Sequence, residues 1–431
     1  MANEFHEEFY RFIIVFLYMM VSALTASINY SFSPITSSLQ KALSTTEFDI
    51  YYLSMSYSIL FIPMNFVANY IIEHFGVKKS IIICCCSQTL CAFIRIFIKS
   101  GFGYVILGQT IGAMGNPFAG NIISKVSLYW FFPQNRIVST AFMSSSYMLG
   151  TAFAFLIGDW TVDDNSSVEE IANQIKKLMI IYLIFAGSVT LVVGLLIQEK
   201  PTNPTSYVSE IPREDYWSAL KSMIVQKDYI YLCLGFSFLL SNYVIFVSFI
   251  TYLISPFGFS QSQIGYIGFG INLACVFGKI AIGFIAGKYV TFRKCLICIA
   301  LSLLVFFGFL LIALFIRNFV VLCCFALLLG LFLQMYWAPS LEFACEIVFP
   351  IGEANANGNM VLSGCIFDTV FGLIFSGALN YFKGNVGVEL IYSYFFISYL
   401  LAALCFYKIV GEMNRSNKET EIILANKKQI F

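Results

Sequence analysis

A short polar stretch near the N-terminus, NYIIEHFGVKK at residues 69–79, separates two long apolar runs. The charges of Glu73, Lys78 and Lys79 are costly inside a bilayer, so this stretch is expected at a membrane surface. Gly76 allows a tight backbone turn because glycine has no Cβ. We therefore predict two antiparallel membrane helices joined by a short loop. The charges at their ends can form pairs that are released when an interface opens.

The composition extends this membrane assignment to the whole chain. Of 431 residues, 59% are hydrophobic and 11% are charged, and the mean hydropathy is +0.81. Soluble domains carry roughly 25% charged and 45–50% apolar residues, so this chain has too little polar surface to fold in water. Soluble enzymes, nucleic-acid binders and disordered chains are excluded, and the net charge of +1 gives no general attraction for polyanions. We expect an all-α polytopic membrane protein whose partners are the lipid bilayer and a small-molecule solute, with protein partners left open and no nucleic acid.

Twelve apolar runs are long enough to cross a bilayer, whose core of about 30 Å needs roughly 20 helical residues. They cover residues 12–33, 51–72, 80–99, 102–126, 137–158, 178–198, 228–254, 263–287, 294–316, 318–343, 357–381 and 388–410. The longest internal polar stretch divides them six and six, an arrangement typical of transporters built from parallel repeats. We predict an N-terminal six-helix half at 1–198, a cytoplasmic linker at 199–227, a C-terminal six-helix half at 228–410 and a cytoplasmic tail at 411–431.

Lysine and arginine set the expected orientation. With both termini cytoplasmic, 17 of these residues fall on the inner side and 7 on the outer side, in agreement with the positive-inside rule. The outer loop before span six contains the glycosylation sequon Asn165-Ser166-Ser167. The acidic segment Met1 to Tyr10 does not resemble a cleaved signal or a transit peptide. We expect the plasma membrane or an endomembrane rather than the mitochondrial inner membrane.

The sequence offers no catalytic motif and no cofactor or metal site. Its 13 cysteines lie in or beside apolar runs, which indicates packing residues rather than disulfides, although Cys84 to Cys86 are candidates for palmitoylation. The two histidines, His6 and His74, lie near water and leave no buried pair to ligate haem iron. No Walker loop, nucleophile triad or dinucleotide-binding glycine motif occurs in a suitable context. We expect a protein that is not an enzyme and needs no cofactor.

The stretch at 69–79 resembles the G-x-x-x-D-R-x-G-R-R motif of the major facilitator superfamily. Glu73 corresponds to the acid, His74 to the first arginine, and Lys78 and Lys79 to the closing bases. At the matching place in the second half, residues 283–288, Gly287 replaces the acid. The resemblance implies two six-helix halves that rock around a central site, with Glu73, Lys78 and Lys79 in an asymmetric gate. Ordinary positive-inside charge at a short loop is the alternative.

A second stretch, LEFACEIVFPIGE at residues 341–353, is similar to a signature of the feline leukaemia virus subgroup C receptor family, E-F-A-x-E-x-x-[YF]-P-x-x-E. Members of that family carry choline and ethanolamine and have been linked to haem export. Further matches occur in the same order along the chain, at Leu53 to Tyr57, Ile62-Pro63, Gly108-Gln109, Trp130-Phe131 and residues 370–375. The resemblance covers the membrane domain, and its specific part is the span-ten motif.

This family resemblance implies a site in which aromatic rings and polar amides hold a quaternary ammonium. The family's span-one Trp corresponds to Ser27, and its span-eleven Gln to Thr369. The span-four amide corresponds to Asn116 and the span-seven aromatic to Tyr243. With their neighbours, these positions give seven candidate substrate-binding residues: Ser27, Asn29, Tyr30, Asn116, Tyr243, Asp368 and Thr369. Because the Trp is replaced, we expect a small organic cation or amine rather than choline in particular.

Asp368 is an ionisable group within an apolar run, which makes it a functional candidate by default. Its carboxylate can pair with a substrate amine or exchange a proton. The alternative is a structural ion pair with Lys279, the lone charge of span eight.

Glu342 and Glu346 are four residues apart and so share one helix face at the cytoplasmic end of span ten. We interpret them as gating residues that pair with a Lys or Arg of a neighbouring loop, with interfacial solvation as the alternative. Lys125 is expected to pair with them, to contact lipid phosphate, or to extend its ammonium group towards water.

These observations predict a secondary carrier that moves a small polar, amine-bearing metabolite by alternating access. A haem or porphyrin carrier of the same fold is the first alternative, and a wide apolar cavity with basic groups would favour it. The second is a transporter-like structural or receptor subunit of a membrane assembly. A central cavity filled by side chains would favour that second alternative.

Overall fold

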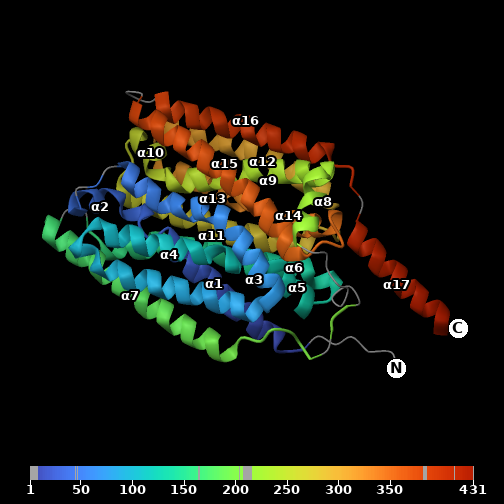
Figure 1. Cartoon of the computed structure of the whole chain (residues 1–431). Coiled ribbons are helices and arrows are strands. Elements are labelled where there is room, and N and C mark those ends of the chain that lie inside the picture. The colour runs from blue at the N-terminus through green and yellow to red at the C-terminus, as the bar shows by residue number, and fades with distance from the viewer. Residues whose placement is uncertain are drawn as a thin grey trace.

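The computed structural model describes residues 8–43, 45, 47–163, 166–202, 204–206, 216–381, 386–411 and 413–430. They form a bundle of long helices whose axes run largely along one direction (Figure 1). The first helix begins at one end of the bundle, and the last helix lies at that same end, which we call the terminal end. The other end is called the opposite end. The sequon residue Asn165 lies outside the described residues.

The first part of the chain supplies six membrane segments. Its elements are α1 (Arg11–Asn29), η1 (Ser33–Ile35), α2 (Thr36–Leu43), α3 (Glu47–Arg95), η2 (Ile96–Ser100), α4 (Phe102–Gly120), α5 (Ile123–Trp130), η3 (Pro133–Asn135), α6 (Arg136–Thr161) and α7 (Val168–Leu196). Helix α3 contains two segments that meet at Gly76, where φ is 87°. A side chain there would overlap the carboxylate of Glu199, so the turn predicted at residues 69–79 depends on glycine.

The second part supplies six more. Its elements are α8 (Tyr216–Val225), α9 (Lys227–Ser248), α10 (Ile250–Ile254), η5 (Ser255–Phe257), α11 (Gln261–Ile285), α12 (Phe292–Ile316), α13 (Phe319–Leu333), α14 (Trp337–Ile347), α15 (Glu353–Tyr381), α16 (Val386–Lys408) and α17 (Asn414–Ile430). By length and hydropathy alone, ten segments of the described chain could cross a membrane. One of the ten holds both segments of α3, and the α4–α5 pair is not among them. The prediction of twelve membrane segments is confirmed.

Two close helix contacts hold the bundle together where glycine removes the side chain. Helix α6 packs against both α1 and α11, and α3 packs against α4 and α15. A Cβ on Gly150 of α6 would overlap the carbonyl group of Ala23 in α1. A Cβ on Gly278 of α11 would overlap the carbonyl oxygen of Leu331 in α13. Backbones can approach this closely in a membrane bundle only at small residues.

Two membrane segments are interrupted. The first interruption lies just beyond Pro117, because α4 continues through this proline to Gly120 and α5 begins at Ile123. The hydroxyl of Tyr18 donates a hydrogen bond to the Ala119 carbonyl, 3.0 Å away, and so satisfies a backbone group near the break. The second interruption, at residues 334–336 between α13 and α14, has no glycine and was not predicted.

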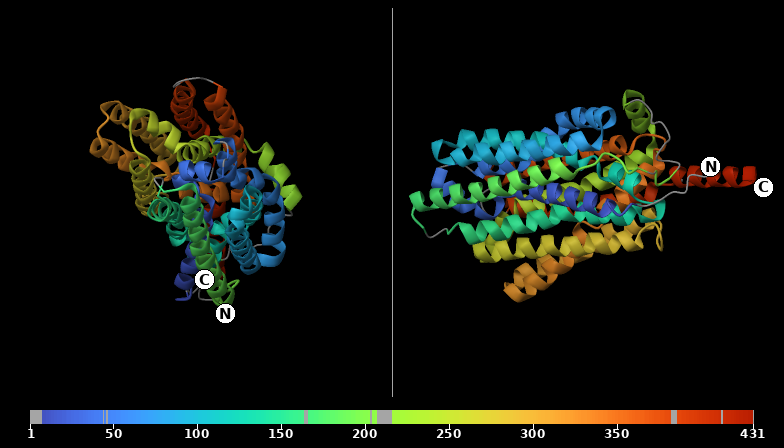
Figure 2. Two further views of the ribbon diagram at one scale, coloured as in Figure 1. Left: turned by 90° about the vertical axis from the view of Figure 1, so that its left-hand side faces the viewer. Right: turned by 90° about the horizontal axis from the view of Figure 1, so that it is seen from below.

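Most of the predicted tail forms a helix, α17. Helix α17 projects from the bundle at the terminal end, as the views in Figure 1 and Figure 2 show. Its first turn is not free, since Arg415 is buried. The start of α17 therefore packs against the membrane domain, while the rest of the helix extends from it.

Candidate functional site

A cavity lies inside the bundle and offers about 110 Å³ to the centres of water-sized molecules. A single water needs roughly 10–15 Å³ on this measure, so the space suits several waters or one small metabolite. Side chains from both parts of the chain line it, contributed by α1, α3, α4, α5, α6, α9, α11, α14 and α15 and by the residues between α13 and α14. A site between helices of a bundle is where small-molecule sites are commonly found.

Five of the seven predicted substrate-binding residues line this cavity: Asn29, Tyr30, Asn116, Tyr243 and Asp368. The other two do not. The Ser27 hydroxyl donates to the Ala23 carbonyl of its own helix, 2.6 Å away. Thr369 is half-buried beside Asp368 but points elsewhere in the bundle, because successive helical residues face different directions.

Aromatic side chains form part of the cavity wall. Tyr30 and Tyr147 meet edge to face with their ring centroids 6.5 Å apart. The Asn29 amide donates to the Tyr147 hydroxyl at 3.1 Å, and the Tyr243 hydroxyl donates to Asn272 at 2.8 Å. These bonds hold the rings in place. Rings fixed in this way can present their faces to a bound cation.

Asp368 is the acidic group of the cavity. Its side chain is 1% exposed, and neither carboxylate oxygen accepts a hydrogen bond of ordinary geometry from the described residues, although the Ser58 hydroxyl lies close enough to interact with it. A buried carboxylate without a partner is costly, so the geometry leaves an acceptor ready for a ligand, a proton or water.

Lys279 is the basic group of the same cavity, and the structure does not pair it with Asp368. Among the described residues no ion pair joins the two. Instead, Lys279 Nζ donates to the Ser144 carbonyl at 3.2 Å and lies 4.9 Å from the centroid of the Trp337 ring. The structural ion pair considered from sequence is therefore wrong, because neighbouring helices offer the ammonium a carbonyl and a ring face instead.

Sequence reasoning missed Trp337 and Gln334, which lie at the interruption of span ten and line the cavity. The Trp337 indole nitrogen and both polar atoms of the Gln334 amide are buried without a hydrogen-bond partner in the described structure. Helix α14 begins at Trp337, so its positive N-terminal end also faces this region. The available signal was a polar glutamine within an apolar run, shortly before Pro339.

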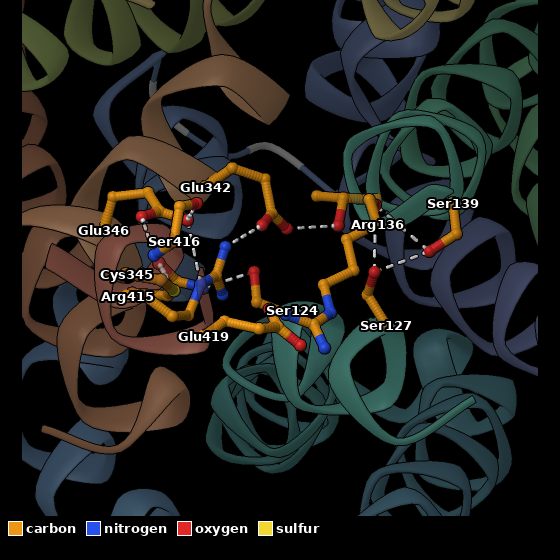
Figure 3. Close-up of polar contacts among 12 residues, drawn as sticks. Ser124, Ser127, Arg136, Ser139, Glu342, Cys345, Glu346, Arg415, Ser416 and Glu419 are labelled. Carbon is orange, nitrogen blue, oxygen red and sulfur yellow. Dashed lines mark hydrogen bonds and ion pairs between the residues drawn. The ribbon is translucent and has the colours of Figure 1, made fainter. Parts of the chain in front are cut away.

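A second polar cluster lies at the terminal end, where the tail meets span ten (Figure 3). Arg415 Nη2 donates to Glu342 at 2.9 Å, and its Nε donates to Glu346 at 3.0 Å. The Ser416 backbone N–H also donates to Glu346 at 2.9 Å, while the Thr140 hydroxyl donates to Glu342 at 2.8 Å. The two predicted gating acids thus bind an arginine of the tail and a threonine of α6.

Electrostatics at this cluster favour the charged arginine. Burial lowers the pKa of Arg415, but Glu342 and Glu346 outweigh it and hold that pKa well above its ordinary value. Nearby, Glu419 lies 3.8 Å from Arg136. Burial raises the pKa of Glu419 above its ordinary value of 4.5, against the opposing effect of Arg136 and Arg415.

Glu73 binds Lys125 rather than the lysines of its own loop. Lys125 Nζ lies 3.0 Å from the Glu73 carboxylate and also donates to the Ile72 carbonyl at 3.2 Å. The partners considered for Lys125 from sequence, Glu342 and Glu346, are therefore wrong, because Arg415 occupies them.

Lys78 and Lys79 are exposed at the Gly76 turn and form no ion pair within the described chain. Lys79 Nζ lies 5.0 Å from the centroid of the Phe75 ring. The carboxylate of Glu199 accepts the backbone N–H of Val77 and of Lys78, each at 2.8 Å. Glu199, which follows the end of α7, is therefore an acid that organises this turn, and the sequence motif did not indicate it.

Polar contacts join the first and second parts of the chain at both ends of the bundle. At the terminal end, Asn65 donates to Asn359 at 3.2 Å and Asn357 donates to Ser124 at 2.6 Å. At the opposite end, the Gln261 side-chain amide donates to the Pro34 carbonyl at 2.9 Å, and the Ser37 hydroxyl donates to the side-chain amide oxygen of Gln261. The cavity therefore lies between two sets of contacts.

In the part of the chain that the structure describes, no group of three or more His, Cys, Asp or Glu side chains could hold a metal ion. The thirteen cysteines are all free, and Cys84 and Cys85 are buried while Cys86 is exposed. Of the three, Cys86 is thus the one whose side chain faces away from the bundle.

Comparison with known proteins gives a consistent picture. Residues 12–367 match the family model of the Major Facilitator Superfamily. Solute carrier family 49 member A3 of Xenopus tropicalis is 24% identical over 382 residues, which cover 85% of this chain and 77% of that protein. The choline/ethanolamine transporter flvcr2a of Danio rerio is 23% identical over 422 residues, covering 95% and 89%. The choline/ethanolamine transporter FLVCR2 of Homo sapiens is 24% identical over 401 residues, covering 89% and 74%.

Solved structures show the same fold at lower identity. The D-xylose-proton symporter superposes with a TM-score of 0.73 at 14% identity, covering 94% of this chain and 99% of that one. A partially occluded inward-open form of the xylose transporter XylE from E. coli gives a TM-score of 0.70 at 15% identity. This likeness concerns the fold alone.

Proposed function

The chain belongs to the major facilitator superfamily, and from this premise we propose that it carries a small, polar, amine-bearing metabolite across a membrane by alternating access. The superfamily match and the transporter relatives establish a multi-pass membrane transporter rather than an enzyme. The substrate class and the site residues are our proposal. Relatives named choline/ethanolamine transporters support it at 21–24% identity.

The observation that carries this proposal is the unpartnered carboxylate of Asp368 in a small cavity with tyrosine walls. A protonated amine bound there would compensate the acid, and Tyr30, Tyr147 and Tyr243 would contact its apolar substituents. We assign substrate binding to Asn29, Tyr30, Asn116, Tyr243 and Asp368. Ser27 and Thr369 are retained as supporting positions behind the cavity wall.

The cavity also weighs against the two alternatives. The space of about 110 Å³ for the centres of water-sized molecules suits a small metabolite better than a four-ring macrocycle, which disfavours a haem carrier. The space is not filled by side chains, which disfavours a structural subunit without cargo. The amine carrier accounts for both observations.

For alternating access we propose two halves, at 1–198 and 228–410, connected by a linker at 199–227 and followed by a tail at 411–431. Their rocking requires that contacts at one end break while those at the other form. The gating residues would be Glu73, Lys78, Lys79, Glu342 and Glu346. Glu73 would act through its ion pair with Lys125, and Glu342 and Glu346 through their ion pairs with Arg415. Lys78 and Lys79 would act at the Gly76 turn.

The termini are proposed to lie in the cytoplasm, because the positive-inside count favours that side. The membrane is proposed to be the plasma membrane or an endomembrane. A glycan on Asn165 would support this location and exclude the mitochondrial inner membrane.

The test is uptake by the purified full chain in proteoliposomes, with labelled choline, ethanolamine, amino acids and haem. We expect uptake of small amines and none of haem. Asp368→Asn should abolish or invert the pH dependence of that uptake, because the carboxylate is the group that exchanges a proton or binds the amine. Asp163→Asn, at an exposed position of the opposite end, is the matched control and should behave as wild type. Unchanged amine kinetics across pH in Asp368→Asn would remove this residue from the mechanism, and uptake of haem alone would overturn the amine proposal.

A further inference from the structure

The cavity contains one acidic and one basic side chain that form no ion pair with each other. Asp368 and Lys279 are each 1% exposed, and both line the same space without an ion pair. Burying two unpaired charges costs several kcal/mol for each ion. A simple cation would compensate Asp368 but would be repelled by the Lys279 ammonium within the same small volume. A ligand that satisfies both side chains therefore needs an anionic group as well as an amine.

The surroundings of Lys279 resemble an anion site. The Trp337 indole N–H and the Gln334 amide group are buried, line the cavity and have no partner within the described residues. Helix α14, eleven residues long, begins at Trp337 and brings the positive end of its dipole to the same place. A lysine ammonium has three protons to donate, and Lys279 Nζ donates one of them to the Ser144 carbonyl, so two remain for a ligand. The Lys279 ammonium, the Trp337 indole N–H and the Gln334 amide nitrogen are donors that an anion can satisfy, whereas the Gln334 amide oxygen is an acceptor.

We propose that the transported substrate is a small zwitterion, with its amine at Asp368 and its carboxylate at Lys279, Gln334 and Trp337. This proposal rests on the proposed function and narrows it from amines to amines that also carry an anionic group. One substrate molecule then compensates both buried charges and satisfies the unpartnered donors. A monoanionic carboxylate fits better than a phosphate, because the cavity supplies a single cation.

The distinguishing experiment compares probes that share an ammonium group and differ in the second group. Betaine is matched with choline, since a carboxylate replaces the hydroxymethyl group, and glycine is matched with ethanolamine in the same way. Each probe is tested on the purified full chain for binding, by its shift of the thermal unfolding midpoint, and for uptake in proteoliposomes. We expect the carboxylate member of at least one pair to bind about tenfold or more tightly than its alcohol, as hydrogen bonds to charged groups imply.

The variants identify the contact. Lys279→Gln should remove the preference for the carboxylate member while the alcohols bind as well as before or better, and Lys279→Arg should restore part of it. Lys294→Gln, at an exposed position, is the matched control and should keep the wild-type preference. If Lys279→Gln does not fold, the wild-type comparison of the matched pairs decides alone.

Two results overturn the inference. The first is a wild-type protein that binds the alcohols at least as well as their carboxylate partners. The second is a Lys279→Gln protein that keeps the wild-type preference. In either case amine uptake would still stand and the proposed function would survive. Absence of uptake for all four probes would instead reject the proposed function and this inference together.

Discussion

Arg415 lies 73 residues after Glu342 in the sequence, yet its Nη2 is 2.9 Å from the Glu342 carboxylate. A tail residue is thus bound within the polar end of span ten. Its guanidinium also reaches Glu346, and the Thr140 hydroxyl of α6 reaches Glu342 from the other side. The first part of the chain, the second part and the tail meet at one carboxylate. We expect this cluster to hold the terminal end closed.

Loss of the arginine should destabilise the protein strongly. Arg415→Gln leaves two buried carboxylates without their cation, and removing one partner of a buried pair costs about 3–5 kcal/mol. We expect a lower denaturation midpoint in detergent and faster alkylation of the buried thiol of Cys345, measured by mass spectrometry of its peptide. Transport should also become faster or uncoupled, because opening this end no longer requires breaking the pair.

The control for this variant is another tail pair. Lys418 lies 2.9 Å from Glu421, but the two side chains are 48% and 68% exposed, and exposed pairs contribute only about 0–1 kcal/mol. Lys418→Gln should therefore leave the midpoint and Cys345 alkylation nearly unchanged. Equal effects of both variants would show that the tail is held by general charge rather than by Arg415.

Docking of α17 should strengthen as the pH falls. The docked tail has a raised pKa at Glu419, so the docked state binds a proton more readily than the undocked state. This contribution is complete below the ordinary value of 4.5 and is lost as the pH rises through the raised pKa. Hydrogen-exchange protection factors of α17 amides should increase as the pH falls from neutral towards 4.5, after correction for intrinsic exchange.

Glu419→Gln should make the protection of α17 less dependent on pH, because the titrating group is gone while the shape of the side chain is kept. Protection that instead rises with pH in the wild type would contradict the assigned sign. An unchanged pH dependence in Glu419→Gln would assign the effect to another group.

The membrane segments could be predicted because bilayer thickness imposes length and hydropathy on every span. The turn at Gly76 could also be predicted, since charge and glycine mark a helix junction. The cavity was only partly predictable. Asn116 and Tyr243 line the cavity, as the family resemblance suggested. Trp337 also lines it, but it follows a helix interruption that contains no glycine to mark it in the sequence.

Partners in space were the least predictable feature. Sequence spacing can place Glu342 and Glu346 on one helix face, but it cannot show that Arg415 reaches them. Likewise, the lone charges of spans eight and eleven suggested a pair, and the rotation of each helix decided otherwise for Lys279. Such choices depend on tertiary packing, which has no local sequence signal.

The pair formed by Glu73 and Lys125 should be measurable by a double-mutant cycle. The two side chains are 20% and 9% exposed and lie 3.0 Å apart, so the pair is only partly solvated. We expect Glu73→Gln and Lys125→Met to be coupled by about 0.5–3 kcal/mol in unfolding free energy, the range for residues in contact. The cycle with Glu73→Gln and Lys79→Gln serves as control, because Lys79 forms no ion pair in the described chain, and it should show no coupling. If the effects of Glu73→Gln and Lys125→Met were additive, the ion pair would contribute nothing to stability and Glu73 would not act as a gating residue through it.

The contact between α1 and α6 gives the last prediction. Gly150 has no room for a methyl group, because a Cβ would overlap the backbone of Ala23, which cannot move without displacing α1. Gly150→Ala should therefore destabilise the protein by about 1–3 kcal/mol, the usual cost of overpacking, and lower the denaturation midpoint in detergent. The matched control is Gly187→Ala on α7, where nothing lies within 4 Å of the added atom and alanine favours the helix. This control should be neutral or slightly stabilising. If both substitutions had the same effect, the α1–α6 contact would tolerate separation, and the rigidity that we assign to the cavity wall at Asn29 and Tyr147 would be lost with it.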